Sequence, residues 1–218
     1  MGNIFSQCKT LLRKIPMLGR VLIWIRLRVV GPALFPGSKQ YWERRYANGG
    51  NSGCGSYSHL AEFKAEVLND FVKEKNVSSV IEHGCGDGNQ LELAQYPKYT
   101  GFDVSRTALA LCSRKFQNDA SKTFLRSDMY SGQEAELALS LDVIYHLVED
   151  ALFDKYMRIL FASAKTYVIV YSSNDEKENS PPHIRHRRFT DWMSVHAPEW
   201  TLCETIKNEF PDSGDHAS

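Results

Sequence analysis

The stretch "VIEHGCGDGNQ", residues 80–90, places three glycines at alternate positions directly after a short apolar run. The run predicts a buried strand, and the residues after the last glycine predict a helix over 89–96. Glycines at the end of a strand let the backbone turn tightly and approach a ligand where a Cβ would collide. This strand–loop–helix context predicts a cofactor-binding loop, and the alternative is a tight turn without a ligand.

The spacing of the glycines separates two classes of cofactor. A dinucleotide fingerprint, G-x-G-x-x-G, would need glycine at position 89 or 91, where the sequence has Asn89 and Leu91. The pattern E-x-G-x-G-x-G instead fits without a gap, starting at Glu82. The spacing therefore disfavours an NAD-type oxidoreductase.

Short apolar runs alternate with helical stripes on both sides of these glycines. Such alternation predicts an α/β fold, with a parallel sheet covered by helices on both faces. The predicted strands are 77–82, 99–104, 122–127, 135–144, 166–172 and 200–206. The predicted helices are one with Ser58 as its N-cap, then 89–96, 105–116, 152–160 and 189–196.

Taken together, these motifs resemble those of the small-molecule class I S-adenosylmethionine-dependent methyltransferases, over roughly residues 41–210. The resemblance implies a Rossmann-like, doubly wound, mostly parallel seven-stranded sheet flanked by helices. It also implies S-adenosylmethionine as the cofactor, with an acid for the ribose hydroxyls ending the second strand and an acid for the adenine amine following the third. The cofactor-binding residues that it implies are Glu82, Gly84, Gly86, Gly88, Asp103, Val104, Asp128, Met129 and Asp142.

Each of the three aspartates also has a plainer interpretation. Asp103 could be a solvated acid at the end of its strand, and Asp128 could cap a helix. Asp142 could serve only to orient the backbone after the fourth strand. The cofactor offers vicinal hydroxyls, an adenine amine and an ammonium, and carboxylates suit all three groups.

His146 is the candidate general base in the segment "LDVIYHLVED", because histidine can take a proton near neutral pH. The competing interpretation is a histidine that packs at the edge of the sheet. A basic loop, "PPHIRHRRFTDW", follows the fifth strand, and in the family this loop often lines the acceptor pocket. Its imidazole and guanidinium groups suit an anionic acceptor, unless the loop is merely solvated. The candidate acceptor-binding residues are Tyr46, Tyr145, His183, His186 and Arg188.

The charges divide the chain into two unequal parts, although the whole has 26 basic and 26 acidic residues. Residues 1–46 carry nine Lys/Arg and one acid, a net charge of +8, and residues 47–218 carry a net charge of −8. Affinity for nucleic acid requires broad positive charge on the catalytic body, so we expect a small-molecule acceptor. We divide the chain into a basic amphipathic arm (1–37), a glycine-rich lid (38–58), a methyltransferase domain (59–210) and a disordered tail (211–218).

The composition, 43% hydrophobic and 24% charged, excludes collagen-like, disulfide-scaffold and wholly disordered classes. Five scattered cysteines without a CxxC pair favour a reduced, cytoplasmic protein, and neither a disulfide framework nor a metal site is predicted. The basic, Trp-bearing arm suits peripheral contact with an anionic membrane. Its alternative is packing on the domain or on a second subunit in a homodimer.

The sequence thus predicts an S-adenosylmethionine-dependent methyltransferase that methylates a small metabolite, an anionic one being an option, by in-line displacement. Oxygen is the favoured acceptor atom, because His146 could deprotonate a hydroxyl group. The sulfonium carries its own driving force, so no metal is needed, and positioning supplies most of the rate gain. The alternatives are a non-catalytic, cofactor-binding interaction protein and, with less support, an NAD-type oxidoreductase.

Overall fold

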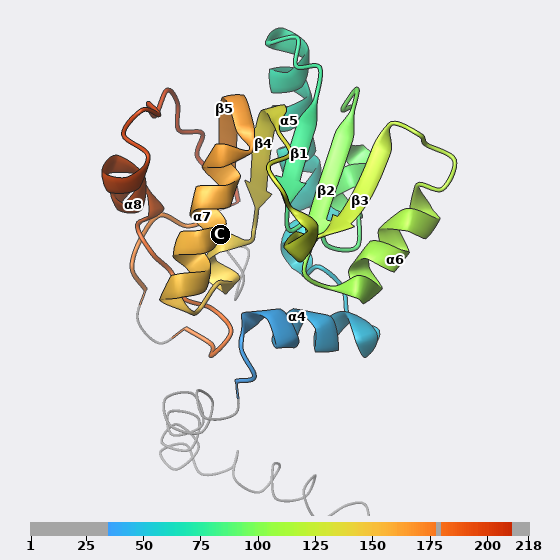
Figure 1. The fold of residues 1–218 in the computed structure, drawn as a ribbon, viewed down its shortest axis with the longest axis horizontal. Coiled ribbons are helices and arrows are strands. Elements are labelled where there is room, and N and C mark those ends of the chain that lie inside the picture. Colours follow the sequence, from blue (N-terminus) through green and yellow to red (C-terminus); the bar gives the residue numbers. More distant parts are fainter. Residues whose placement is uncertain (1–34, 178–179, 211–218) are drawn as a thin grey trace, which may run out of the picture.

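The structure, a computed structural model, describes residues 35–177 and 180–210. Five strands in these residues form one sheet of order β3-β2-β1-β4-β5 (Figure 1), and every neighbouring pair is parallel. This arrangement confirms the predicted Rossmann-like α/β class. The strands are β1 (Val80–His83), β2 (Tyr99–Asp103), β3 (Lys122–Arg126), β4 (Ala135–Leu141) and β5 (Ala164–Tyr171).

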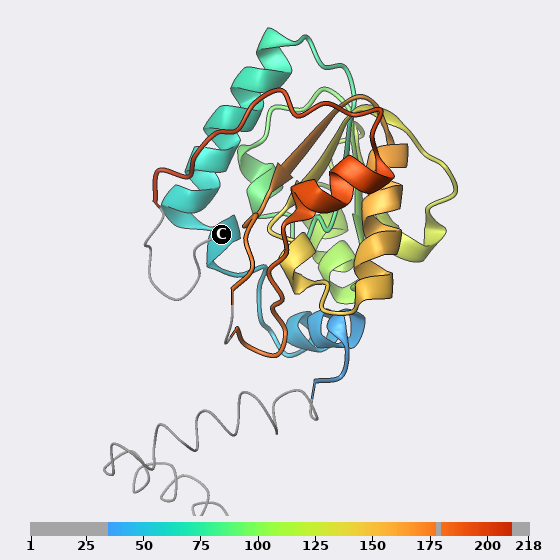
Figure 2. The same cartoon turned by 90° about the vertical axis from the view of Figure 1, so that its left-hand side faces the viewer.

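Helices cover both faces of the sheet, as the view along its edge shows (Figure 2). Helices α5 and α6 pack on one face and α7 and α8 on the other. Successive strand residues alternate between the faces, so Val80 joins the core under α5 while Ile81 joins the core under α7. The helices are α4 (Ser38–Ala47), α5 (Ser58–Glu74), α6 (Arg106–Lys115), α7 (Asp150–Ala162) and α8 (Phe189–His196).

The strand order reverses at β1, which lies between β2 and β4. In open parallel sheets, ligands bind outside the carboxyl ends of the strands at such a reversal, because the connections leave in opposite directions there. Short 3-10 turns follow several strands at this edge or precede α5. They are η2 (Cys54–Ser56), η3 (Gln90–Leu93), η4 (Ser127–Met129) and η5 (Ile144–His146).

Helix α4 lies across the carboxyl edge of the sheet (Figure 1). At its first residue, the Ser38 N–H and Oγ donate to the Glu149 carboxylate at 3.0 and 2.6 Å. At its middle, the Glu43 carboxylate accepts from the Arg106 N–H at 2.8 Å and from the Thr107 hydroxyl at 2.9 Å. The helix is therefore fixed to the N-termini of both α7 and α6, and it bridges the reversal point.

Three local predictions differ from the structure. The predicted strand 200–206 is wrong, because Leu202 and Ile206 are 58% and 54% exposed and the segment pairs with no strand. The described residues accordingly hold five strands rather than the expected seven. The predicted helix 89–96 is only the 3-10 turn η3, since Pro97 disfavours helical geometry just before it. Ser58 is the first residue of α5, and Tyr57 is its N-cap.

Two predictions concern segments that lie outside the described residues. They are the basic arm, apart from its last three residues, and the tail 211–218. Among the helices of the described part, none is both long and apolar enough to cross a membrane.

Candidate functional site

The glycine loop, residues 84–88, follows β1 at the reversal point. Gly84, Gly86 and Gly88 have φ angles of +91°, +57° and +74°, which strain any residue with a Cβ. A Cβ at Gly84 would collide with Cγ2 of Val143, and one at Gly86 would collide with the Ser52 hydroxyl. The loop is thus enclosed between the segment after β4 and the lid, in a cradle that only glycine allows.

Asp103, the last residue of β2, is joined directly to this loop. It is 6% exposed, and its carboxylate accepts from the Gly86 N–H at 2.9 Å and from the Ser105 N–H at 2.8 Å. Burial raises the pKa of Asp103 to about 6, and the amide hydrogen bonds oppose that rise. The predicted ribose-binding acid, with Val104 next along the chain, therefore lies beside the predicted cofactor loop.

Glu82 is a second buried acid, one strand away from Asp103. It is 4% exposed, and its Oε2 accepts from the Tyr99 hydroxyl at 2.6 Å. Burial raises the pKa of Glu82 to about 7, and the nearby Asp103 adds to the rise. A buried carboxyl of raised pKa is stabilised in its charged form by a donor or a cation. Glu82, Asp103 and the glycine cradle therefore fit the ammonium and ribose hydroxyls of S-adenosylmethionine.

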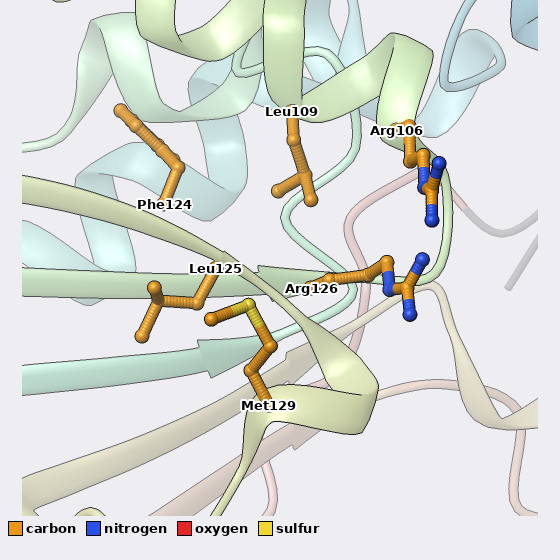
Figure 3. A pocket seen from close by; sticks show the side chains of 6 residues that line it. All are labelled: Arg106, Leu109, Phe124, Leu125, Arg126 and Met129. Carbon is orange, nitrogen blue, oxygen red and sulfur yellow. The ribbon is translucent and has the colours of Figure 1, made fainter.

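Asp128 and Met129 lie farther along the sheet, in the turn after β3. The Asp128 carboxylate forms a two-point ion pair with Arg126, which lowers the pKa of Asp128. An adenine amine would have to share this carboxylate with the guanidinium. Met129 is 58% exposed. It borders an open pocket of about 400 Å³ between α6 and β3 (Figure 3), lined by Arg106, Leu109, Phe124, Leu125, Arg126 and Met129.

Asp142 follows β4 in an unusual backbone conformation, with a φ of +59°. Its Oδ2 lies 2.5 Å from Nζ of Lys64, and its Oδ1 accepts from the Tyr145 hydroxyl at 2.9 Å. Only 8% of the Asp142 side chain is exposed. The structure thus places Asp142 at the reversal point, where it organises the segment after β4.

His146 ends the turn η5, four residues beyond Asp142. Its Nδ1 lies 3.1 Å from the carbonyl oxygen of His183, so Nδ1 carries the hydrogen and the Nε2 lone pair can accept a proton. Burial lowers the pKa of His146 to about 4, which keeps the ring neutral at physiological pH. The rings of Tyr145 and Trp42 lie 4.4 and 4.8 Å from it, centroid to centroid.

Two arginines of the basic loop are engaged by the protein itself. Arg187 donates to the carbonyls of Leu147 and Val148 at 2.7 and 2.9 Å, and Arg185 pairs with Asp150 at 2.9 Å. These arginines brace the segment after η5, so they do not present free charge to a ligand.

The three predicted acceptor-binding residues of this loop are placed differently from one another. His183 stacks on Tyr41 at 4.6 Å, centroid to centroid, beside His146. Nδ1 of His186 lies 2.5 Å from the Ser173 hydroxyl. Arg188 is exposed at the N-cap of α8. The fold therefore brings His183 to the ring of the candidate base and leaves Arg188 at the surface.

The lid is held against the glycine loop by Asp87, which lies inside that loop. The Asp87 carboxylate accepts from the Ser52 N–H and from the Tyr57 hydroxyl, both at 2.9 Å. These hydrogen bonds lower the pKa of Asp87 against the opposing effect of burial. Tyr46, predicted to contact the acceptor, lies close to Gly86, with its hydroxyl 2.9 Å from that of Ser52.

Three functional candidates were missed by reasoning from the sequence: Lys64, Asp87 and Glu43. Lys64 had a detectable signal, because it falls between Leu60 and Leu68 at helical spacing, where a charged residue is out of place. Asp87 and Glu43 had none, since the lid partners of Asp87 and the α6 partners of Glu43 lie 30 or more residues away in the sequence.

Comparison with solved structures finds the same fold in chains of low sequence identity. Magnesium protoporphyrin IX methyltransferase (ChlM) of Synechocystis PCC 6803, with bound SAM, aligns with a TM-score of 0.55 and 14% identity over 76% of this chain and 86% of that one. The [4+2]-cyclase SpnF aligns with a TM-score of 0.56 and 17% identity over 73% and 72%. N-methyltransferase NodS of Bradyrhizobium japonicum WM9, in complex with S-adenosyl-L-homocysteine, aligns with a TM-score of 0.50 and 18% identity over 59% and 68%.

Similarity at this level of identity establishes the fold and not the reaction, and the cyclase among these chains illustrates the point. No curated protein matches the sequence. The family is established separately, by a model described as "Methyltransferase domain" that matches residues 57–208. That match spans the glycine loop, Asp103, Asp142 and His146, so the chain belongs to the S-adenosylmethionine-dependent, class I methyltransferase domain family.

Proposed function

We propose that the chain transfers the methyl group of S-adenosylmethionine to an oxygen atom of a small acceptor, with His146 as the general base. The observation that carries this proposal is the fixed tautomer of His146. Because its Nδ1–H is bound to the His183 carbonyl, the basic lone pair of the neutral ring is on Nε2. A neutral ring with this lone pair can take the proton that a hydroxyl acceptor must lose as its oxygen attacks, although burial, by lowering the pKa of His146, weakens it as a base in the free protein.

Residues at the glycine loop bind the cofactor in this proposal, and residues of the segment after β4 bind the acceptor. Glu82, Gly86 and Asp103 bind the amino-acid and ribose parts of the cofactor, which supplies the methyl group as a sulfonium. The segment from Asp142 to His146 faces the glycine loop through Val143, and it would present the acceptor to the methyl carbon. Nε2 of His146 would take the proton of the acceptor hydroxyl as the acceptor oxygen forms its bond to the methyl carbon, and the electron pair of the S–CH₃ bond would remain on sulfur.

The aromatic side chains around His146 would exclude water from this transfer. Trp42 and Tyr41 come from α4, and Tyr145 and His183 come from the loops after β4 and β5. Exclusion of water strengthens the electrostatic interactions at the reacting atoms and aligns the acceptor with the methyl group. An anionic group on the acceptor would lie nearest to His183, the member of the basic loop that stacks beside His146.

Calorimetry with S-adenosylmethionine and with NAD tests the cofactor part of the proposal. We expect binding of the first and none of the second. A chain that binds only NAD would contradict the proposal outright. A chain that binds S-adenosylmethionine without transferring methyl groups would favour the non-catalytic, cofactor-binding alternative.

Substitution of His146 tests the catalytic part. Labelled cofactor and a panel of small hydroxyl compounds, each paired with its carboxylated counterpart, identify the acceptor for the full chain. We expect His146→Gln to lower kcat about 100-fold or more, the usual contribution of a general base, and to leave the Kd for the cofactor unchanged. His196→Gln is the matched control, because His196 is exposed on α8. Equal turnover in the two variants would overturn the assignment of His146 as the base.

A further inference from the structure

Helix α5 places one lysine in the interior of the protein. Lys64 is 2% exposed, and it shares the buried face of the helix with Leu60, Ala61 and Leu68. A buried ammonium is costly to desolvate unless a partner compensates its charge. Its position behind the reversal point of the sheet therefore calls for a specific reason.

The surroundings of Lys64 supply that compensation from two strands. Its Nζ lies 2.5 Å from Oδ2 of Asp142 and 4.9 Å from the centre of the Tyr171 ring. The same ammonium acts on Glu82, where it opposes the effect of burial on the pKa. Lys64 is thus the cation between the acid that ends β4 and an acid of the predicted cofactor site.

Asp142 connects Lys64 to the surroundings of the proposed base, His146, through Tyr145. Its other oxygen, Oδ1, accepts from the Tyr145 hydroxyl at 2.9 Å. The Tyr145 ring lies 4.4 Å from the His146 ring, and the Tyr145 carbonyl accepts from the Arg185 N–H at 2.7 Å. A continuous path of contacts therefore joins Lys64 to the base, and each link is a short polar or ring contact.

The backbone at Asp142 shows why this path needs an anchor. Its φ of +59° is a left-handed conformation that costs a non-glycine residue energy and persists only where the surroundings hold it. The Asp142 N–H donates to the Tyr171 carbonyl at 2.9 Å, and a Cβ at Gly55 of the lid would lie 2.5 Å from Asp142 Oδ2. The ion pair with Lys64 fixes the side chain of this strained residue, as the backbone hydrogen bond fixes its main chain.

We propose that Lys64 is a positioning residue for methyl transfer: through Asp142 and Tyr145 it holds the His146 ring with Nδ1 on the His183 carbonyl and Nε2 facing the acceptor. This assignment rests on the proposed function. It goes beyond that function by giving a buried lysine of α5, outside both loops, a part in the reaction.

The test compares four variants of the full chain: Lys64→Met, Lys64→Arg, the double variant Lys64→Met/Asp142→Asn, and Lys73→Met. The double variant removes both charges, so we expect it to fold even if Lys64→Met leaves an uncompensated buried aspartate. Lys73 is exposed on the same helix and serves as the matched control. The measurements are thermal unfolding, the Kd for S-adenosylmethionine, kcat with the best hydroxyl acceptor of the panel, and the ¹⁵N shifts of His146.

The ¹⁵N shifts are the decisive readout, because they report the tautomer of His146 without any acceptor. In the wild-type chain and in Lys73→Met we expect a single neutral form protonated at Nδ1. In Lys64→Met and in the double variant we expect a mixture of the two tautomers and a kcat about 10- to 100-fold lower, as for a misplaced catalytic group. Lys64→Arg keeps the charge, so it should recover much of the turnover.

Two outcomes overturn the assignment. One is a double variant that keeps both the wild-type tautomer and the wild-type kcat, since the ion pair would then only stabilise the fold. The other is a loss of turnover in Lys64→Met that follows its loss of thermal stability, with the tautomer unchanged. Failure of the wild-type chain to bind S-adenosylmethionine would instead contradict the proposed function, and the shifts of His146 would still report on Lys64.

Discussion

The loops after β1 and after β4 face each other across the reversal point, yet they are built by different means. The course of the glycine loop is set by its own left-handed glycines, and its Gly86 N–H donates to the Asp103 carboxylate. The segment after β4 is held by side chains from distant parts of the chain, above all Lys64 of α5 and Arg187 of the basic loop. The first loop is therefore defined by a local motif, and the second by tertiary contacts.

This difference predicts how each loop fails. A substitution at one of the glycines of the first loop acts on the backbone itself, so it should weaken cofactor binding strongly. A substitution around the second loop moves the His146 ring or changes which of its nitrogens carries the proton, so it should leave cofactor binding intact and reduce turnover. Four predictions test this contrast, in order of decreasing effect.

The largest effect is expected for Gly84→Ala. The alanine would have to adopt a φ of +91°, and its Cβ would collide with Val143 Cγ2. The loop would therefore have to move away from the segment after β4. We expect the affinity for S-adenosylmethionine to fall about 100-fold or more, because the strain and the lost approach act together. Gly132→Ala is the control, since Gly132 has a φ of +97° with nothing near its Cβ position. Similar Kd values for the two variants would refute a cradle at Gly84.

The second effect concerns pH. Burial raises the pKa of Glu82 to about 7, so the free protein holds a proton there that a bound ammonium would displace. As pH rises through this pKa, ionisation of the buried Glu82 carboxyl costs the folded protein stability, and a bound ammonium would offset that cost. The affinity for S-adenosylmethionine should therefore increase about 10-fold from pH 5.5 to 7.5, with proton release, as one coupled ionisation allows.

Calorimetry in buffers of different ionisation enthalpy measures this proton release directly. Glu82→Gln should abolish the part of the pH dependence centred near 7, whereas Glu66→Gln on the exposed face of α5 should retain it. An unchanged pH profile in Glu82→Gln would remove Glu82 from the ammonium site.

The third effect is smaller and concerns the lid. Asp87→Asn keeps the shape of the side chain and weakens its hydrogen bonds to the Ser52 N–H and the Tyr57 hydroxyl. Hydrogen bonds to a charged group contribute about 1.5–3 kcal/mol each, and the amide retains part of this, so we expect roughly 5-fold faster release of the cofactor. Stopped-flow dissociation measures it, with the exposed Asp70→Asn as control. A rate equal to that of the control would show that Asp87 does not hold the lid.

The smallest effect on catalysis is expected from deletion of residues 1–34. The glycine loop and the acid that ends β2 lie outside this segment of the sequence, so we expect the Kd for the cofactor to change by less than about 2-fold. Residues 1–46 carry a net charge of +8, and we propose that the basic arm serves location or assembly. Sedimentation with anionic vesicles and light scattering of the full chain and the deletion variant test this, and unchanged results in both would contradict it.

Local signals in the sequence were enough for the parallel α/β architecture and for the cofactor residues that we propose. Apolar runs of strand length predicted all five strands of the described residues, because strands between two layers of helices are mostly apolar. The same reasoning failed at 200–206, where an apolar pattern is not covered by any neighbouring element. An apolar pattern in the sequence shows which segment could be buried, and the packing of neighbouring elements decides whether it is.

The acceptor half depended on contacts that no local pattern encodes. The basic loop suggested an anion site, but Arg185 and Arg187 hold the segment after η5 instead. The Tyr46 hydroxyl lies close to Gly86 and Ser52, contacts that no local pattern indicated. A charged or aromatic side chain has many favourable partners, and the fold selects among them.

By itself, the sequence determined the glycine loop, the acid at the end of β2 and the parallel sheet, because glycine spacing and apolar periodicity act through the backbone over a few residues. The tertiary structure alone decided that Lys64 meets Asp142, across 78 positions of sequence, and that His146 carries its hydrogen on Nδ1. A proton position and a buried ion pair depend on groups brought together by folding, and their energies are set by burial and by partners rather than by residue type.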